Sequence, residues 1–172
     1  MKNAHIATAK GTNIPISRKN SIEIASFIRG KDVSKIKKTL ENVLKEKTAV
    51  PFKRFNKDRG HKKGPIAAGR FPKKATKEIL KLIESAEANA QNKGLNSESL
   101  TLSTIVVNKG TTQWRHGRQR RRQRKMCHIE VTVEEKEEKK KATKKEEPKK
   151  IEKTVKEKKD TPKKEETKEE KK

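Results

Sequence analysis

Residues 105–133, IVVNKGTTQWRHGRQRRRQRKMCHIEVTV, decide the fold of this chain. They open with the apolar run IVV and close with Ile129, Val131 and Val133, which alternate with polar residues. Such alternation is typical of a β-strand with one buried face. The two ends of the stretch therefore predict two β-strands that pair with each other.

Between these strands lies a basic arm, residues 111–126, which contains no acidic residue. If the 17 residues 110–126 continue both strands as a paired ribbon, its tip projects some 25 Å beyond the sheet. An isolated two-stranded hairpin is marginal in water, so we expect the arm to be mobile unless a partner holds it. Its cations are Arg115, Arg118, Arg120, Arg121, Arg122, Arg124 and Lys125. Arginine binds phosphate bidentately and stacks on bases, so the arm predicts a polyanionic partner.

Trp114 is the only aromatic residue of the arm. It could belong to the core, but its neighbours are polar and cationic. We therefore expect it to stack on a base or to pack within the arm.

The charge of the whole chain points the same way. Lys and Arg number 48 against 23 Asp and Glu, which gives a net charge of +25. Residues 1–133 hold 31 of these bases and 10 of the acids, whereas residues 134–172 hold 17 and 13. The strongly basic part is therefore residues 1–133, and nucleic acid is the first partner to expect.

Other classes of partner are less compatible with the sequence. No apolar run approaches the roughly 20 residues that span a bilayer, and no signal-type segment begins the chain, so we expect an intracellular protein without a membrane span. One cysteine and four histidines without ligand spacing predict no disulfide, no metal and no cofactor. No homo-oligomer is expected.

Three segments have helical periodicity. The first can be capped by Ser17 or by Asn20, which with Glu23 resembles a capping box, and it ends at Arg29-Gly30. The second begins at Asp32 and the third near Pro72, and both repeat apolar residues at intervals of three and four. The third should stop before Lys93-Gly94.

Two further segments have strand character. Residues 1–16 predict an extended arm or edge strand, and residues 95–107 predict a strand that includes Leu100 and Leu102. The expected fold is therefore α+β, with about three helices packed on a small antiparallel sheet. We expect it to form one nucleic-acid-binding domain over residues 1–133, from which the hairpin of about residues 105–133 protrudes.

Residues 48–71, here called the loop, have no convincing period. Phe52, Phe55 and Phe71 alternate with cations, and only Asp58 opposes them. The cations are Lys53, Arg54, Lys57, Arg59, Lys62, Lys63 and Arg70. Loops of this length are functional or disordered, and we expect the phenylalanines to anchor this one while its cations face phosphate.

Residues 134–172 are rich in Lys and Glu and nearly free of apolar residues. Such a segment cannot bury enough apolar surface to offset its chain entropy. We predict a disordered, solvated tail.

Two local motifs could indicate a nucleotide site or a catalytic thiol, but a structural role is favoured for each. Residues 64–71 have the glycine spacing of a phosphate-binding P-loop but lack its Lys-Ser/Thr, so a turn-rich surface loop is favoured. Cys127 beside His128 could suggest a thiol nucleophile, but no supporting base is visible. Alternation places these two side chains on opposite faces of a strand, so a passive pair is favoured.

Six short motifs in order resemble the universal large-subunit ribosomal protein twenty-two family, in its archaeal and eukaryotic form. They are NIPIS at 13–17, FIRG at 27–30, AVPF at 49–52, AEANA with KGL at 86–95, HGR at 116–118 and CHIE at 127–130. The likeness covers about residues 1–133. It differs at residues 120–125, RRRQRK, where relatives have a more mixed stretch.

The resemblance implies a non-enzymatic constituent of the large subunit of the cytoplasmic ribosome. It would bind and organise ribosomal RNA during assembly, and its hairpin would line the nascent-peptide exit tunnel. His116, Gly117 and Arg118 would lie at the hairpin tip, next to the nascent peptide, and neighbouring ribosomal proteins would be further partners. The rival classes are an architectural DNA-binding protein and an RNA-processing enzyme. The enzyme would need a cluster of acids, and the ten acids of residues 1–133 are expected to be spread over helix surfaces.

Overall fold

A computed structural model describes residues 5–136 of the chain. The predicted disordered tail lies outside these residues, apart from its first three. The elements in chain order are β1 (Ile6–Ile14), α1 (Arg18–Ile28), α2 (Val33–Leu44), β2 (Val50–Pro51), β3 (Gly69–Arg70), α3 (Lys73–Asn92), the 3-10 helix η1 (Ser97–Ser99), β4 (Leu100–Lys109), β5 (Gln113–Trp114), the 3-10 helix η2 (Gly117–Gln119), β6 (Gln123–Arg124) and β7 (Cys127–Glu135).

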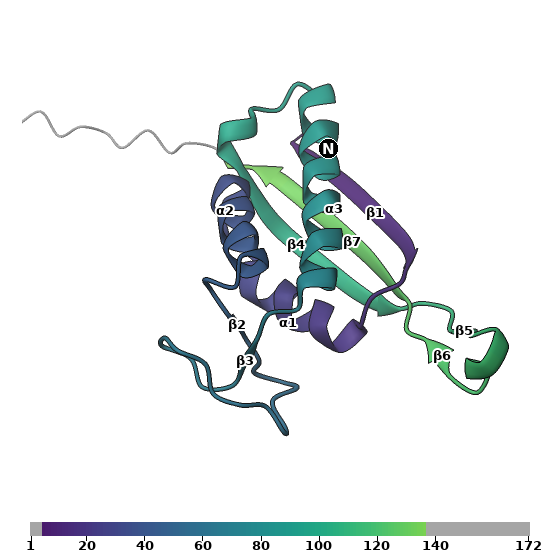
Figure 1. Ribbon diagram of the computed structural model, residues 1–172. Helices are drawn as coiled ribbons and strands as arrows, with labels where there is room; N and C mark the ends of the chain where they lie inside the picture. The colour runs from purple at the N-terminus through teal and green to yellow at the C-terminus, as the bar shows by residue number, and fades with distance from the viewer. Residues whose placement is uncertain (1–4, 137–172) are drawn as a thin grey trace, which may run out of the picture. The chain divides into compact units, whose positions relative to one another are not determined.

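The largest sheet has three antiparallel strands in the order β1-β7-β4. β4 and β7 pair along their whole length, from Leu100 opposite Glu135 to Lys109 opposite Cys127. The predicted strand pair is thus confirmed, and its second strand runs two residues beyond Val133. β1 is an edge strand on the other side of β7 (Figure 1).

The helices cover one face of this sheet (Figure 1). α3 packs on β1 and β7, α1 packs on β4, and α2 packs on α3. Alternate residues of β7 point into the core that results, and Cys127, Ile129, Val131 and Val133 are fully buried there. The predicted α+β class, with three helices on a small antiparallel sheet, is confirmed.

Both edges of the sheet are closed by groups from the helical layer. Asn89 and Lys93 of α3 donate hydrogen bonds to backbone carbonyls of β1, at 2.9 and 2.8 Å. On the other edge, the backbone N–H of Gly30 donates to the Leu102 carbonyl at 2.9 Å, and the Arg29 guanidinium donates to the Ile105 carbonyl at 3.1 Å. Unpaired strand edges invite aggregation, so these contacts protect the fold.

The start of α1 agrees with the expectation for Ser17 and differs from it for Asn20. The helix begins at Arg18 with Ser17 as its N-cap residue, and the N-cap side chain makes no capping bond. The predicted capping box of Asn20 and Glu23 is wrong, because the Glu23 carboxylate is buried and accepts hydrogen bonds from the loop instead. Glu23 therefore bonds to a distant segment of the chain and does not cap its own helix.

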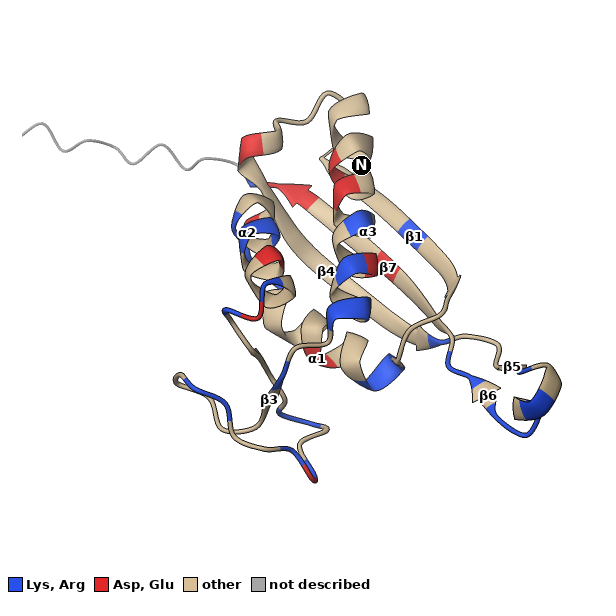
Figure 2. Cartoon of the chain, in the orientation of Figure 1, with Lys and Arg blue, Asp and Glu red and all other residues tan. Residues whose placement is uncertain are grey.

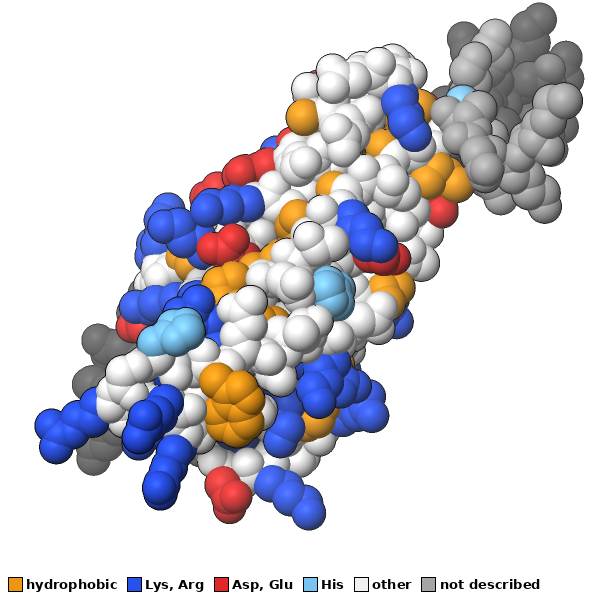
Figure 3. All heavy atoms as spheres, turned by 90° about the vertical axis from the view of Figure 1, so that its right-hand side faces the viewer, with side chains coloured by type: hydrophobic (Ala, Val, Ile, Leu, Met, Phe, Trp, Pro, Cys, Tyr) orange, Lys and Arg blue, Asp and Glu red, His pale blue; other side chains and the backbone are white. Residues whose placement is uncertain are grey.

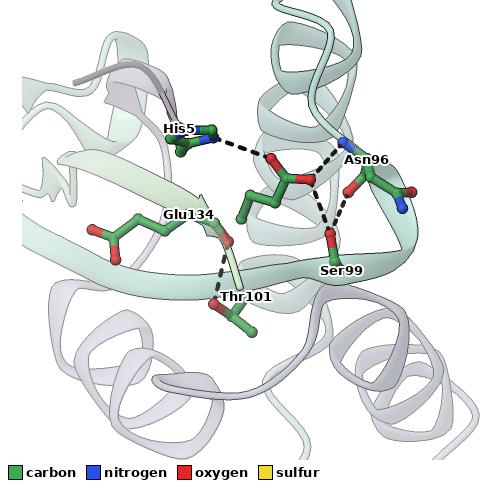
Figure 4. A network of polar contacts seen from close by, with 6 residues as sticks. His5, Asn96, Ser99, Thr101 and Glu134 are labelled. Atoms are coloured by element: carbon green, nitrogen blue, oxygen red, sulfur yellow. Dashed lines mark hydrogen bonds and ion pairs between the residues drawn. The ribbon is translucent and has the colours of Figure 1, made fainter. Parts of the chain in front are cut away.

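The strand predicted over residues 95–107 begins only at Leu100. Asn96 accepts a hydrogen bond from the Glu98 backbone N–H at 3.1 Å, which starts the turn η1 before the strand. Figure 4 shows a carboxylate, that of Glu135, holding this turn: it accepts hydrogen bonds from the Asn96 backbone N–H and the Ser99 hydroxyl, both at 3.3 Å. It also pairs with the His5 ring at 3.3 Å, so one acid joins β1, η1 and β7.

Candidate nucleic-acid interface

The basic arm is a hairpin whose paired part is short. Gly110 still continues the main ladder, since its N–H donates to the Met126 carbonyl at 3.0 Å. Beyond a break, only Gln113 and Trp114 pair with Arg124 and Gln123. The fully paired ribbon expected from the sequence is therefore wrong.

The tip of the arm is a compact turn. Its backbone closes through hydrogen bonds from Arg115 to Arg122 at 2.9 Å and from Arg120 to Gly117 at 3.1 Å. Gly117 begins η2 with a φ of +67°, a conformation that glycine adopts without a steric penalty. The predicted tip residues, 116–118, do lie at this turn.

The arm makes no contribution to the core before Met126. Every residue from 111 to 125 is exposed, and Trp114 retains 60 % of its accessible surface. A core position for Trp114 is therefore excluded. Stacking on a base and packing within the arm both stay predictions for this indole.

The loop, in contrast, is tied to the core by a buried acid. Glu23 lies on the inner side of α1 and is only 2 % exposed. Its carboxylate accepts the backbone N–H groups of Lys53, Arg54 and Phe55 at 3.1, 2.9 and 2.7 Å. The two oxygens thus fix three successive residues in one turn. The expectation that the acids of the domain lie on helix surfaces is wrong for Glu23.

Two of the three phenylalanines expected to anchor the loop do so, whereas Phe71 does not belong to the core cluster. Phe52 is 3 % exposed and belongs to the core, and Phe55 packs against the core from outside. Cations lie over the rings: the guanidinium of Arg59 is 5.7 Å from the centroid of Phe52, and that of Arg54 is 5.5 Å from Phe55. Such contacts orient the cations as well as stabilising the turn.

The loop also has regular structure that its sequence did not reveal. β2 pairs with β3 through Val50 opposite Arg70 and Pro51 opposite Gly69, and a single bridge joins His61 to Ala68. Residues 62–67 connect the two sides of this bridge, closed by a hydrogen bond from the Lys62 N–H to the Ala67 carbonyl at 3.0 Å, and Gly64 has a φ of +118°. This arrangement fits the interpretation of residues 64–71 as a turn-rich surface loop.

The loop and the arm give the cationic character to one end of the domain. Figure 2 shows Lys and Arg on the loop, on the arm, along α2 and in the first half of α3; acids lie on η1, on α3 and on β7, and also on α1, α2 and the loop. Figure 3, which faces the arm side, shows basic side chains predominating over its lower half. Within residues 5–136, none of the fourteen predicted cations of the loop and arm pairs with an acid.

Cys127 and His128 point to opposite faces of β7. The Cys127 thiol is buried and donates to the Ile16 carbonyl at 3.3 Å, and burial raises its pKa above the ordinary value. His128 accepts a hydrogen bond from the Asn13 backbone N–H at 3.2 Å. A thiol that stays protonated is a poor nucleophile, so both residues have a structural part.

The described residues offer little for other chemistry. Among residues 5–136, no three His, Cys, Asp or Glu side chains gather as a metal site would require. In that same range, no helix has the length and apolar character needed to cross a membrane.

The fold and this surface define a small basic α+β protein that presents an anchored cationic loop and a cationic hairpin, as proteins of ribonucleoprotein assemblies do. Residues 9–134 match the family model described as ribosomal protein L22p/L17e, and the chain belongs to that family. Membership makes it a structural, non-enzymatic protein of the large subunit of the cytoplasmic ribosome.

Archaeal relatives support the assignment. The large ribosomal subunit protein uL22 of Methanococcus aeolicus is 43% identical over 136 residues, which cover 75% of this chain and 89% of the relative. The protein of the same description from Methanocaldococcus jannaschii is 43% identical over 136 residues, 75% of this chain and 87% of its own. That from Staphylothermus marinus is 41% identical over 142 residues, with 77% and 90% covered.

Proposed function

We propose that this protein binds and organises large-subunit ribosomal RNA during assembly, through the loop and the basic arm. The observation that carries the proposal is the arm: fifteen successive exposed residues, 111–125, without one acid and outside the core. A segment of this kind gains its stable conformation from a partner, and seven cations require that partner to be a polyanion.

The two surfaces suit different parts of the task. Two of the loop cations, Lys53 and Arg54, project from a turn that Glu23 and Phe52 already fix, so they bind phosphate at a small ordering cost. The arm offers arginines and an exposed indole, which suit stacking and phosphate contacts in a folded RNA. Neither kind of contact requires the protein to recognise a particular base.

We further propose that the tip of the arm, residues 116–118, lines the exit tunnel and meets the nascent peptide. Its support is the resemblance to the family together with the position of these residues at the turn of the hairpin. The remaining partners are then the neighbouring ribosomal proteins that surround the domain.

The proposed RNA binding can be tested by removing the arm without touching the core. A variant with residues 111–125 replaced by two glycines should keep the fold, because all of the removed residues are exposed. We expect it to lose incorporation into large subunits on sucrose gradients and to bind a large-subunit RNA transcript at least about a hundredfold more weakly. Unchanged incorporation and affinity would refute the proposal.

Two controls separate the alternatives. An architectural DNA-binding protein would bind duplex DNA as tightly as the RNA transcript and would not sediment with ribosomes. For the tunnel, a photo-crosslinking residue at Arg118 should label a stalled nascent peptide, whereas the same residue at Lys38 on α2 should not. Labelling that is equal at both positions would remove the tip from the tunnel.

A further inference from the structure

The loop and the base of the arm face a common cavity. This cavity has a volume of about 580 Å³, is open to solvent, and also receives the first turn of α1. Each of the three segments contributes two cations to its wall: Arg18 and Lys19, Arg59 and Arg70, and Lys109 and Lys125. No acid lines it.

The protein itself does not neutralise this cluster. Within residues 5–136, none of the six cations lies within ion-pair distance of an Asp or Glu. Lysines elsewhere in the domain do have such partners: Lys10 pairs with Glu130 at 2.6 Å and Lys73 with Glu46 at 2.8 Å. Like charges that converge on one cavity repel each other, and an anion from outside relieves that repulsion.

Several of these cations are held in place by the fold. Lys109 ends β4, where it pairs with Cys127 across the ladder. The Lys19 ammonium lies 5.6 Å from the centroid of Phe55, and the Arg59 Nε donates to the Phe55 carbonyl at 3.5 Å. Three of the six cations are therefore positioned before any ligand arrives, which lowers the cost of binding.

We propose that this cavity binds backbone phosphates of an RNA segment that passes from the loop to the arm. The proposal rests on the proposed function and adds a third segment, the first turn of α1, to the interface. Neutral hydrogen-bonding groups of Ser17 and Asn20 line the same wall and suit phosphate oxygens. Because the cavity is open, a polymer can run through it. Because its cations come from three segments, a bound RNA strand would contact the loop, the arm and α1 together.

The test removes only the cations that α1 supplies. The full chain with Arg18→Gln and Lys19→Gln is compared with a matched control, Lys38→Gln and Lys45→Gln, which changes two exposed lysines at the α2 helix by the same charge. Affinity for a large-subunit ribosomal RNA transcript is measured over a series of salt concentrations. Circular dichroism confirms that both variants are folded.

We expect the α1 variant to bind about tenfold more weakly than the control. The slope of log affinity against log salt should be lower by about 1.5 to 2, since each phosphate contact contributes about 0.7 to 0.9. Equal affinity and equal slope for the two variants would overturn the inference while the proposed function stands. Wild-type protein without salt-dependent RNA binding would overturn both.

Tripolyphosphate distinguishes RNA from a free anion. If the α1 variant binds RNA like the control but has lost the rise in melting temperature that tripolyphosphate gives the wild type, the cavity is a small-anion site and the RNA assignment is wrong. Loss of both responses supports the proposed phosphate contacts.

Discussion

The loop and the basic arm carry seven cations each, but the fold holds them in opposite ways. The loop is fastened from within: Glu23 fixes three of its backbone N–H groups, and Phe52 enters the core. Between its two ends, where Thr111 donates to the Asn13 side chain and Met126 is buried, the arm has only its own short ladder and turn, and its indole is exposed. A cationic surface is preorganised only where apolar and hydrogen-bonding anchors accompany the charges.

This difference separates stability from binding. Changes to the anchors of the loop should alter the free energy of unfolding, because those anchors are part of the folded core. Changes to the arm should alter RNA binding and leave the free energy of unfolding almost unchanged.

The largest effect is expected at Glu23. Replacement by Ala leaves three backbone N–H groups of the loop without their acceptor, which should lower the free energy of unfolding by about 4 kcal/mol. Glu23→Gln keeps one acceptor oxygen and should lose roughly half as much. Urea unfolding measures both. The exposed Glu84→Ala on α3 is the control, and an equal loss there would contradict the anchoring role.

The next contrast lies between the base and the tip of the arm. A Cβ on Gly110 would lie 3.0 Å from the Asn13 side chain and from backbone atoms of Met126 and Cys127, so Gly110→Ala should cost about 2 kcal/mol. A Cβ on Gly117 would meet nothing within 4 Å, and only its positive φ opposes the change, at about 1 kcal/mol. Thermal unfolding of both variants tests the order, and a larger loss at Gly117 would show that the tip is the better ordered part.

A smaller stability effect, with a clear binding effect, is expected at Trp114. Because the side chain is 60 % exposed, Trp114→Ala should change the free energy of unfolding by no more than about 0.5 kcal/mol. Loss of one stacked base would weaken RNA binding by about 1 to 3 kcal/mol. Trp114→Phe keeps a ring and should recover part of this. A destabilised Ala variant whose binding Phe does not restore would show packing within the arm.

The smallest effect is expected at Glu135, which lies at the end of the sheet opposite the arm. The hydrogen bond from His5, with those from Asn96 and Ser99, holds the pKa of Glu135 below its ordinary value. The folded state therefore binds a proton less readily than the unfolded state, so this contribution to stability is present above the unfolded pKa. It should vanish as the pH falls through the lower, folded pKa.

The measurement is the difference in unfolding free energy between wild type and Glu135→Gln across acidic pH. The difference should shrink as the pH falls. It should be the same with and without residues 111–125, because the arm lies beyond the other end of these strands. A difference that is constant with pH would contradict the role of the carboxylate.

Periodicity was enough to find most elements. The alternation in residues 127–135 and the spacing in α2 and α3 reflect which side chains face the core, and that information is local. It failed at α1, where Asn20 and Glu23 have the spacing of a capping box. There the Glu23 carboxylate accepts hydrogen bonds from the backbone of residues 53–55, which are distant in sequence, and does not bond to the helix end.

The candidate site divides in the same way. The cations of the loop and arm can be read from the sequence because charge runs are visible in one dimension. Arg18, Lys19 and Lys109 could not, because each is an ordinary cation within its own segment and becomes part of a cluster only when three segments meet.

The sequence by itself thus determined the class of fold and the paired strands around the basic arm, and it predicted a polyanionic partner. These follow from local periodicity and net charge. Only the tertiary structure decided how the loop is anchored, where the arm stops being a ribbon, and which cations share a cavity. Those features depend on contacts between residues far apart in the chain, which no local pattern encodes.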